Sequence, residues 1–412
     1  MNKGVVIMKI LSTDVCIVGG GPAGMMMALL LAKQKVNVMV VERNSNFDRE
    51  FRGEVLQPRF VQMLEQLNLR SYIESFSHLK LKHGAIMKDS AQIGEFNFSA
   101  IDAKFPYAMW MPQPVLLQAL YKKCQEYPSF SMLFHTKVQN LLKEGEQITG
   151  VITKNAQGEE LEIQAKVTIG ADGRFSTIRQ LGRFEFEYDF YENDLIWFTI
   201  PHPKDMDHTL RFYMSKPIYL VLPKYPDLMQ IGLAFPKETW KEMRENGIEK
   251  FRRTLSNLNP IFKIFAEEVQ DFKAFTVLNS RVQYVKEWSK DGCLLFGDAA
   301  HCASPVGAMG VSLSVATGII AADVVWKGLK KQDTTQGWLG QVQTNRSPEI
   351  RLFHRSQIRI EKLAIRHTPW LKAVGGAMIP LFIKTKLARA IQRRIFLMPK
   401  PLPIDSSFVF DN

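Results

Sequence analysis

The sequence predicts an α/β protein in which a parallel sheet is covered by helices, an antiparallel sheet is inserted into it, and a helical region follows on the C-terminal side. Three observations predict this fold. Apolar strand and helix patterns alternate from residue 14 to residue 42, aromatic-rich alternating segments fill residues 186–285, and helical patterns dominate after about residue 310. The composition, 46% hydrophobic and 23% charged over 412 residues, excludes a disordered, collagen-like or coiled-coil protein.

The first structural unit is predicted from residues 14–42. Residues 14–18 form an apolar strand, and a glycine-rich loop follows it. Residues 22–35 predict a helix that is apolar on almost every face, so we expect it to be buried under a sheet. Residues 36–42 predict a second strand, which ends at Glu42. A right-handed crossover then places the two parallel strands side by side.

The loop between these elements carries the pattern Gly19-x-Gly21-x-x-Gly24. Gly19 permits a tight turn, Gly21 lets a pyrophosphate approach the backbone, and Gly24 lets the helix pack closely. The helix N-terminus offers unpaired N–H groups and a positive dipole end to the phosphates. Glu42 can accept hydrogen bonds from the hydroxyls of an adenosine ribose. The pattern therefore predicts an adenine dinucleotide, but it does not separate FAD from NAD.

Further elements follow from apolar periodicity and turn residues. After about Gly310 the remainder is predicted to be helical. The elements expected before it are helices at 58–69 and 113–127, strands within 84–99, a three-stranded meander at 132–165 with turns at Gly145 and Gly158, a further buried strand ending at Gly173, antiparallel strands at 194–201, 209–215, 218–223 and 228–236, and a buried parallel strand at 292–300.

Two more motifs follow predicted buried strands. Asp298 ends one of these strands beside a helix start, where a carboxylate can accept a hydrogen bond from a ribityl hydroxyl. The positive end of the next helix dipole would stabilise an anionic reduced flavin. The two motifs read Gly170-Ala171-Asp172-Gly173-x-x-Ser176-x-x-Arg179 and Gly297-Asp298-Ala299-Ala300-His301, the second followed by Pro305, Gly307 and Gly310.

The three motifs, in this order, resemble the FAD-dependent aromatic hydroxylases of the para-hydroxybenzoate hydroxylase type, the single-component class A flavoprotein monooxygenases. The resemblance covers roughly residues 13–330. It implies a bound FAD, NADPH or NADH as electron donor, and insertion of one oxygen from O2 into an aromatic or similarly electron-rich small molecule through a flavin C4a-hydroperoxide. A single dinucleotide-binding fold is visible, which fits this family because its nicotinamide donor binds without a second one.

The resemblance also implies a division of the chain into a Rossmann-type FAD-binding domain, an inserted antiparallel β-sheet substrate domain and a basic helical C-terminal region. We expect the substrate domain to hold the organic molecule over the flavin. The expected segments are 1–80, 106–185 and 288–330 for the FAD-binding domain, 81–105 and 186–287 for the substrate domain, and 331–412 for the C-terminal region.

Site residues follow from the same resemblance. Arg52 is expected to contact the flavin, Gln113 to reach the ribityl chain, and Val138 to lie near the adenine, while Pro305 lies beside the reacting part of the ring. The chain departs from the family at Ser312, where Asn is usual, and at Thr317, where an acid is frequent. Expected catalytic residues are Pro305 and Arg52, and expected cofactor-binding residues are Gly19, Gly21, Ala23, Gly24, Glu42, Arg43, Arg52, Gln113, Val138, Asp172, Arg179, Asp298, Pro305, Gly307, Gly310, Val311 and Ser312.

Other interpretations stay open. Flavin halogenases resemble this fold and carry Trp-x-Trp-x-Ile-Pro, but residues 196–201 read Ile-Trp-Phe-Thr-Ile-Pro, which puts neither tryptophan in register. A prenyl-chain reductase acting at a membrane and a non-enzymatic flavin- or lipid-binding regulator are further alternatives. Only about half of the aromatic residues in the inserted sheet are expected to line a substrate pocket, because strand side chains alternate between faces. These residues are Trp197, Phe212, Tyr213, Tyr219 and Phe235.

The charge is concentrated near the C-terminal side. The net charge is +12, and residues 350–400 hold twelve Lys or Arg against one acid, Glu361. This region is a solvated helical face or a surface for an anionic membrane. Nucleic-acid binding is not expected, since no recognition motif accompanies the charge.

Cysteine usage and hydropathy give the expected location. The four cysteines show no metal-binding spacing, so no metal site is predicted. No uninterrupted run of eighteen apolar residues predicts a spanning helix. We therefore expect a cytoplasmic protein, with peripheral membrane association through the basic C-terminal region as an alternative.

Overall fold

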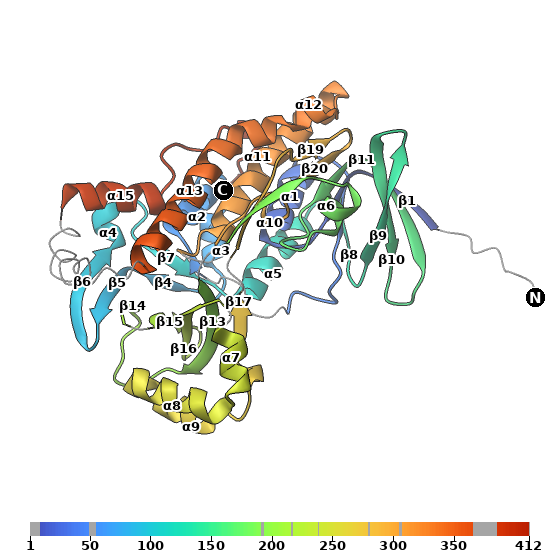
Figure 1. Ribbon diagram of the computed structural model, residues 1–412. Coiled ribbons are helices and arrows are strands. Elements are labelled where there is room, and N and C mark those ends of the chain that lie inside the picture. The colour runs from blue at the N-terminus through green and yellow to red at the C-terminus, as the bar shows by residue number, and fades with distance from the viewer. Residues whose placement is uncertain are drawn as a thin grey trace, which may run out of the picture.

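The computed structural model places a sheet-and-helix body beside a second sheet with its own helices (Figure 1). Two of the expected site residues, Arg52 and Pro305, lie outside the described residues. The structure describes residues 9–48, 55–190, 193–215, 217–237, 239–278, 281–304, 307–365 and 385–411.

The larger body is built on an eight-stranded sheet with the order β19-β20-β11-β1-β2-β8, in which β10 and β9 extend from β11. The strands β20, β11, β1, β2 and β8 pair in parallel, as the sequence predicts for a βαβ arrangement. The bounds are β1 Lys9–Val18, β2 Val38–Val41, β8 Phe130–Leu133, β9 Lys137–Glu144, β10 Gln147–Lys154, β11 Glu160–Gly170, β19 Ser289–Lys290 and β20 Cys293–Leu295.

One of the expected strands is wrong in extent. The meander at 132–165 and the buried strand ending at Gly173 share a single strand, β11. Its first half pairs with β10 at the sheet edge, while its second half lies between β1 and β20. The first half therefore alternates in burial and the second is buried throughout, so that one strand shows two sequence patterns.

Three long helices form the interior of this body. α1 (Pro22–Lys33) is buried at ten of its positions, as its all-round apolar sequence predicts. It packs between α5 (Gln113–Cys124) and α11 (Gly310–Lys331). By length and hydropathy α11 could cross a membrane, yet 78% of its most apolar stretch is buried inside the protein. Its close contact with α1 marks it as a core helix.

The second sheet has seven strands in the order β17-β13-β16-β15-β14-β5-β6. It is antiparallel except for the parallel pair β14 and β5, which joins residues from two distant parts of the chain. Three helices that the sequence analysis did not predict, α7 (Thr239–Glu245), α8 (Ile248–Leu258) and α9 (Lys263–Glu268), belong to its outer side. The strand bounds are β5 His83–Lys88, β6 Ala91–Asn97, β13 Asn193–Pro201, β14 Leu210–Tyr213, β15 Ile218–Lys224, β16 Leu228–Pro236 and β17 Thr276–Leu278.

Shorter elements connect the two sheets. The predicted helix at 58–69 corresponds to α2 (Pro58–Gln66), which ends before Asn68, whose φ is +57°; a separate helix, α3 (Arg70–Glu74), follows. The remaining connecting elements are β3 Val55–Leu56, β4 Leu79–Leu81, α4 Phe98–Ile101, β7 Ala108–Trp110, α6 Thr177–Leu181, β12 Phe186–Phe190, η1 Pro260–Phe262, η2 Phe272–Ala274, β18 Arg281–Val285 and α10 Asp298–His301.

The C-terminal region is helical and returns to the first body. It contains α12 (Gln336–Leu339), α13 (Gln341–Ile365), α15 (Lys386–Phe396) and η3 (Ser406–Phe408). The carbonyl of Ser407 accepts hydrogen bonds from Lys33 Nζ at 2.7 Å and Gln34 Nε2 at 2.8 Å. The segment 397–411 thus crosses the outside of α1 and α2, with Phe408 fully buried against Trp326.

Candidate active site

The three glycine-containing motifs meet at the carboxyl ends of the parallel strands β1, β11 and β20. A Cβ atom on Gly19 would lie 2.4 Å from the carbonyl oxygen of Ala171, so the first loop touches the second motif. The amide of Phe296 donates to the Gly170 carbonyl at 3.2 Å, which joins the second motif to the third. A Cβ atom on Gly297 would lie 3.9 Å from the Cβ of Ala23. Segments far apart in sequence therefore share one site, as the motif order predicts.

The glycine loop brings the N-terminus of α1 close to the sheet. Gly19 has a φ of +111°, which glycine adopts without strain. A Cβ atom on Gly24 would lie 2.2 Å from the carbonyl oxygen of Gly19, so only glycine fits there. Gly21 precedes α1 and no side chain caps the helix, whose first internal bond runs from Met25 N to Gly21 O at 2.9 Å. The uncapped turn leaves backbone N–H groups for a phosphate.

Glu42 is buried at the end of β2, with 3% of its surface exposed. Its Oε2 accepts a hydrogen bond from Gly20 N at 2.9 Å, and its Oε1 accepts from the backbone and side chain of Asn44 at 3.0 and 2.8 Å. These bonds fix the carboxylate beside the glycine loop. A carboxylate oxygen accepts in more than one direction, which is the property that contact with a ribose hydroxyl requires.

Two further residues expected to bind the cofactor lie around Glu42. Arg43 is exposed directly after it. Val138, half-buried in β9, comes two residues after Thr136, whose amide donates to the Glu42 carbonyl at 3.0 Å. Gln113 is the first residue of α5 and is 9% exposed.

The N-terminus of α11 forms the other end of the site. No side chain caps it, and its first internal bond runs from Leu313 N to Met309 O at 3.0 Å. A Cβ atom on Gly310 would meet no atom of the described residues within 4 Å. Ser312 is buried, and its Oγ has no hydrogen-bond partner in the described part of the chain. Val311, which lies between Gly310 and Ser312 in the sequence, is half-buried.

The distance between the two uncapped helices can be estimated from their packing. A Cβ atom on Gly318 would lie 2.8 Å from the carbonyl oxygen of Ala23, so this point of α11 abuts the start of α1. Gly310 begins α11 eight residues earlier, which is about 12 Å along the helix axis. The two N-termini are thus separated along α11 by about this length, which suits an elongated dinucleotide.

Asp172 and Arg179 hold the second motif together. Asp172 Oδ2 accepts hydrogen bonds from the amides of Thr177 and Ile178 at 2.6 and 3.1 Å, at the start of α6. Burial raises the pKa of Asp172 in spite of these bonds. Arg179 is 3% exposed and donates to the Ala299 carbonyl at 2.9 Å. The Arg179 side chain therefore connects the second motif to the third.

Asp298 opens α10 and is half-buried. Its Oδ1 accepts a hydrogen bond of 3.4 Å from Ser314 Oγ of α11. Arg174 is a neighbour that the sequence analysis missed. Burial alone would lower the pKa of Arg174, but Cys302 and Asp298 beside it raise that pKa. Its position inside the second motif, two residues after Asp172, was the available signal.

Gln57 is a second residue that the sequence analysis missed. It lies before α2, is 6% exposed, and donates from Nε2 to the Gly307 carbonyl at 2.9 Å. Gly307 has a φ of +82° and Ala308 a φ of +52°, so the loop before α11 turns twice in the left-handed region. Gln57 therefore helps to fix the loop that presents the α11 N-terminus.

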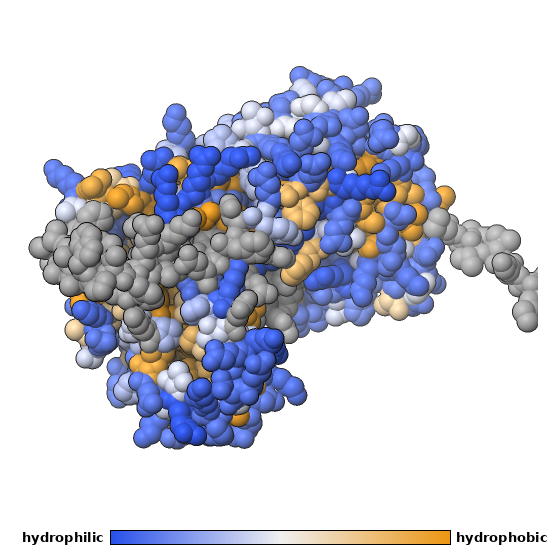
Figure 2. Space-filling view, viewed as in Figure 1, coloured by the Kyte–Doolittle hydropathy of each residue, from blue (hydrophilic) through white to orange (hydrophobic). Residues whose placement is uncertain are grey.

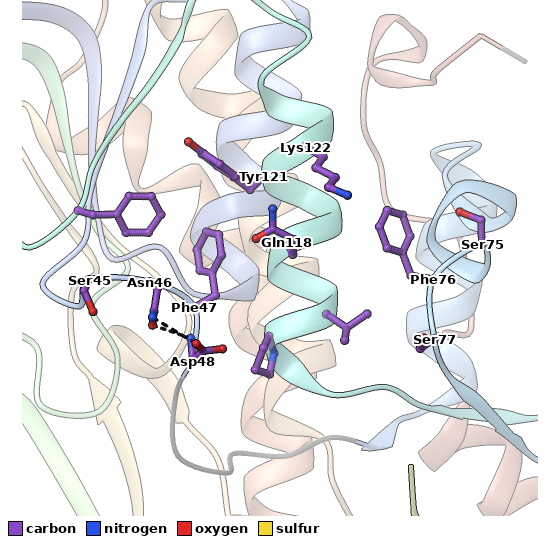
Figure 3. A pocket seen from close by; sticks show the side chains of 13 residues that line it. Ser45, Asn46, Phe47, Asp48, Ser75, Phe76, Ser77, Gln118, Tyr121 and Lys122 are labelled. Carbon is purple, nitrogen blue, oxygen red and sulfur yellow. Dashed lines mark hydrogen bonds between the residues drawn. The ribbon is translucent and has the colours of Figure 1, made fainter. Parts of the chain in front are cut away.

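A surface pocket of about 710 Å³ lies beside the site, not between the motifs (Figure 3). Phe47 of the loop after Glu42 packs on Tyr121 of α5 at one side of it, and Ser75, Phe76 and Ser77 lie at the other. None of its lining residues belongs to the three motifs. We therefore place the candidate cofactor site at the motifs and not in this pocket.

The two faces of the seven-stranded sheet belong to different cores. Trp197 packs in the main core, with the body that carries the motifs. Tyr213, Tyr219 and Phe235 pack in the second core, with α8 and α9. Phe212 alternates with Tyr213 and lies opposite Leu220, so it shares the inner face with Trp197. Two of the five aromatic residues therefore lie on the inner face, and their lining of a substrate pocket stays a prediction.

Two buried histidines lie behind the loop that follows β20. His301 is 1% exposed and packs on Trp288 with the ring centroids 4.8 Å apart. Burial, followed by the effects of His354 and Arg346, holds the pKa of His301 well below its usual range. Burial and then Arg351 lower the pKa of His354 to about 4. Both imidazoles are therefore neutral in the folded protein near pH 7.

These histidines should make the protein acid-sensitive. An unfolded histidine has a pKa of about 6.5, so below that pH protonation favours the unfolded chain. We expect stability to be complete above pH 6.5 and to fall as the pH drops toward 4, with roughly 3 kcal/mol lost through His354. Urea unfolding across this range measures the slope. His354→Gln should flatten it, and His83→Gln, at an exposed position, should not; equal slopes would contradict the assignment.

Comparison with known proteins agrees with the geometry. Residues 12–328 match the family described as FAD binding domain. The chain is 29% identical to 6-methylpretetramide 4-monooxygenase of Streptomyces rimosus over 394 residues, covering 93% of this chain and 92% of that protein.

Solved structures share the fold. The p-nitrophenol 4-monooxygenase PnpA of Pseudomonas putida DLL-E4 is 18% identical with a TM-score of 0.79, covering 95% of this chain and all of that one. The myxobacterial chondrochloren halogenase CndH, an FAD-dependent halogenase, is 18% identical with a TM-score of 0.75, covering 94% and 95% of the two chains.

Proposed function

The chain belongs to the FAD-dependent aromatic hydroxylase family and is a monooxygenase, and we propose that it uses NADPH or NADH to insert one oxygen atom from O2 into an aromatic or similarly electron-rich small molecule. The observation that carries this proposal is the meeting of three motifs at two uncapped helix N-termini.

The residues present fit FAD. The N-terminus of α1, with Gly21 and Ala23, would hold the pyrophosphate, and Glu42 the adenosine ribose. Asp298 and Gln113 would hold the ribityl chain, a role that the family resemblance implies for both. A Cβ atom on Gly310 would meet nothing in the described residues, which suits the approach of a ring to the backbone at the N-terminus of α11. The buried Ser312 hydroxyl, which has no partner in the described chain, is a polar group that a bound ring could satisfy.

Bound and reduced FAD supplies the activation of dioxygen. The chain supplies position and shielding. The positive end of the α11 dipole favours negative charge on the ring. The inner face of the seven-stranded sheet, with Trp197 and Leu222 buried at 8% and 6% exposure, excludes water from the substrate. Arg52 and Pro305 remain proposed contacts of the flavin by resemblance alone.

We propose that Gln230 is the polar group that recognises the substrate. It is 2% exposed in β16, and its Oε1 has no hydrogen-bond partner within the described residues. Met229 and Ile231 beside it belong to the outer core, so alternation turns Gln230 to the inner face. Its neighbours there are Thr199 and Leu222 across the strand pairs. A buried amide oxygen on an apolar face suits a planar substrate that carries one O–H or N–H donor.

Gln230→Leu should therefore raise the KM of the substrate about three- to tenfold, the usual effect of one lost hydrogen bond. FAD affinity should stay unchanged, and stability should not fall, because an unpaired buried acceptor is removed. The matched control is Gln92→Leu, an exposed position in the same sheet. The KM is measured on the substrate that the screen described below identifies. An unchanged KM in the Gln230 variant would contradict the role of this amide.

Halogenation is the second candidate, supported by the similarity in fold to CndH. A Trp-x-Trp pattern is lacking, and Phe198, next to Trp197, faces the outer core. A chlorinated product formed with a separate flavin reductase would replace the first proposal with this one.

The compartment proposed is the cytoplasm. All four cysteines are buried and form no disulfide. Free thiols in every position suit a reducing environment.

The decisive experiment is a substrate screen with the purified FAD-bound protein. NADH and NADPH oxidation is followed across a library of phenols and fused-ring aromatics, and product mass is measured. We expect one class to accelerate the oxidation and to gain a single atom from ¹⁸O-labelled dioxygen. A protein that binds no FAD, or a product without the label, would overturn the proposal.

A further inference from the structure

The positive charge of the protein gathers in its C-terminal region. Residues 350–400 hold twelve Lys or Arg and one acid, against a net charge of +12 for the whole chain. The rest of the chain is therefore close to neutral. The described cations of this region are exposed, namely Arg351, Arg355, Arg359, Lys386, Arg389, Arg393, Arg394 and Lys400.

Within this region α15 is attached to the body by one face. Ala388 is buried, at 3% exposure, and Phe396 packs on Phe98 with the ring centroids 5.3 Å apart. Arg393 forms an ion pair of 3.0 Å with Asp102, beside α4. The helix begins with a capped turn, in which Thr385 Oγ1 accepts from the Ala388 amide at 3.1 Å. α15 is therefore a fixed helix and presents its other side outward (Figure 1).

The outward side of α15 combines aliphatic and cationic groups. Leu387 is 62% exposed and Ile391 is 44% exposed, and their spacing of four residues puts them on one side of the helix. Arg394, one turn further, lies on the same side, and Lys386 flanks it, whereas Arg389 lies on the side of Phe396. No acid occurs in the helix. At the upper left of Figure 2, apolar atoms are exposed among hydrophilic ones at this edge.

Large aliphatic side chains that stay exposed beside unpaired cations are the pattern of a helix lying in a membrane interface. In the described chain, no carboxylate pairs with Lys386, Arg389 or Arg394. An acidic protein partner would pair with the cations, but acidic groups alone would not bury the side chains of Leu387 and Ile391. An anionic bilayer surface satisfies both, because its headgroups attract the cations and its acyl boundary accepts Leu387 and Ile391.

We propose that the outward face of α15 docks the protein on an anionic lipid surface, with Leu387 and Ile391 inserted and Lys386 and Arg394 on the phosphates. This docking is peripheral and reversible, because two aliphatic side chains and one short helix do not span a bilayer. The inference is independent of the oxygenation chemistry, so either can fail without the other.

The test is vesicle co-sedimentation of the full-length, FAD-bound protein. Vesicles are made of phosphatidylcholine alone or of phosphatidylcholine with phosphatidylglycerol. We expect binding only to the anionic vesicles, and we expect high salt to weaken it at least tenfold. Equal binding to both vesicle types, or none to either, would overturn the proposal.

Two variants separate the insertion from the charge. Leu387→Asp/Ile391→Asp should weaken binding about tenfold at every salt concentration, and Lys386→Glu/Arg394→Glu should abolish the salt-sensitive part. The matched controls are Ile264→Asp, at a 65% exposed position of α9, and Lys241→Glu in the exposed α7. Circular dichroism checks that all four variants are folded. Binding that falls equally in the controls would overturn the assignment to α15.

Discussion

Gly24→Ala is expected to weaken FAD binding at least tenfold and to lower the thermal midpoint of the FAD-free protein. The added Cβ would lie 2.2 Å from the carbonyl oxygen of Gly19 and 3.4 Å from Ile17 Cγ2. The carbonyl belongs to the backbone of the phosphate loop, so it cannot rotate away as a side chain can. α1 or the loop must shift, and the shift moves N–H groups that a pyrophosphate needs in place. Fluorescence titration of FAD measures the loss.

The control for this prediction is Gly337→Ala. A Cβ on Gly337 would meet nothing within 4 Å, and the residue lies in α12, where alanine is favoured over glycine by about 1 kcal/mol. This variant should bind FAD like the unaltered protein and be no less stable. If Gly24→Ala bound FAD with unchanged affinity, the site would not lie at the glycine loop.

Glu349→Gln is expected to cost about 3–5 kcal/mol of unfolding free energy. Glu349 lies between two nearly buried guanidinium groups: Arg59 donates to Oε1 at 2.8 Å and Arg346 pairs with Oε2. Burial alone would raise the pKa of Glu349, but the charges of Arg346 and Arg59 hold that pKa below its usual range. The amide would leave two buried cations, 2% and 5% exposed, without a counter-charge.

Urea unfolding of the FAD-free protein measures this effect. The matched control is Glu245→Gln, whose partner Lys241 is 4.0 Å away and where both side chains are well exposed. That variant should change stability by no more than about 0.5 kcal/mol. Equal small effects in both variants would show that the triad of Arg59, Glu349 and Arg346 is not important for stability.

The sequence predicted what short-range patterns encode. The glycine loop, the buried α1 and the end of β2 at Glu42 are contiguous in the chain, so their spacing alone indicates the phosphate site. The convergence of the other two motifs followed from family resemblance, and the contacts of Gly19 and Gly297 agree with it. Proposed flavin contacts within these motifs stay predictions.

Long-range packing could not be predicted in the same way. Arg59 and Glu349 are 290 positions apart, and no local pattern marks either of them. The helices α7, α8 and α9 were missed because their aromatic residues were interpreted as part of the sheet. Phe251 and Leu255 have helical spacing, and they cover the outer face of the sheet with Phe262.

The segment from Leu397 to Asp411 has a consequence for how the protein is made. Lys33 of α1 reaches Ser407, which the ribosome adds 374 positions later. The amide of Phe410 donates to the Leu67 carbonyl at 3.0 Å, and Phe408 fills a fully buried place beside Trp326. During synthesis the N-terminal part therefore exposes an apolar surface until this stretch has emerged from the ribosomal exit tunnel. Chaperone dependence during synthesis should accordingly rise when translation of the C-terminal stretch is slowed.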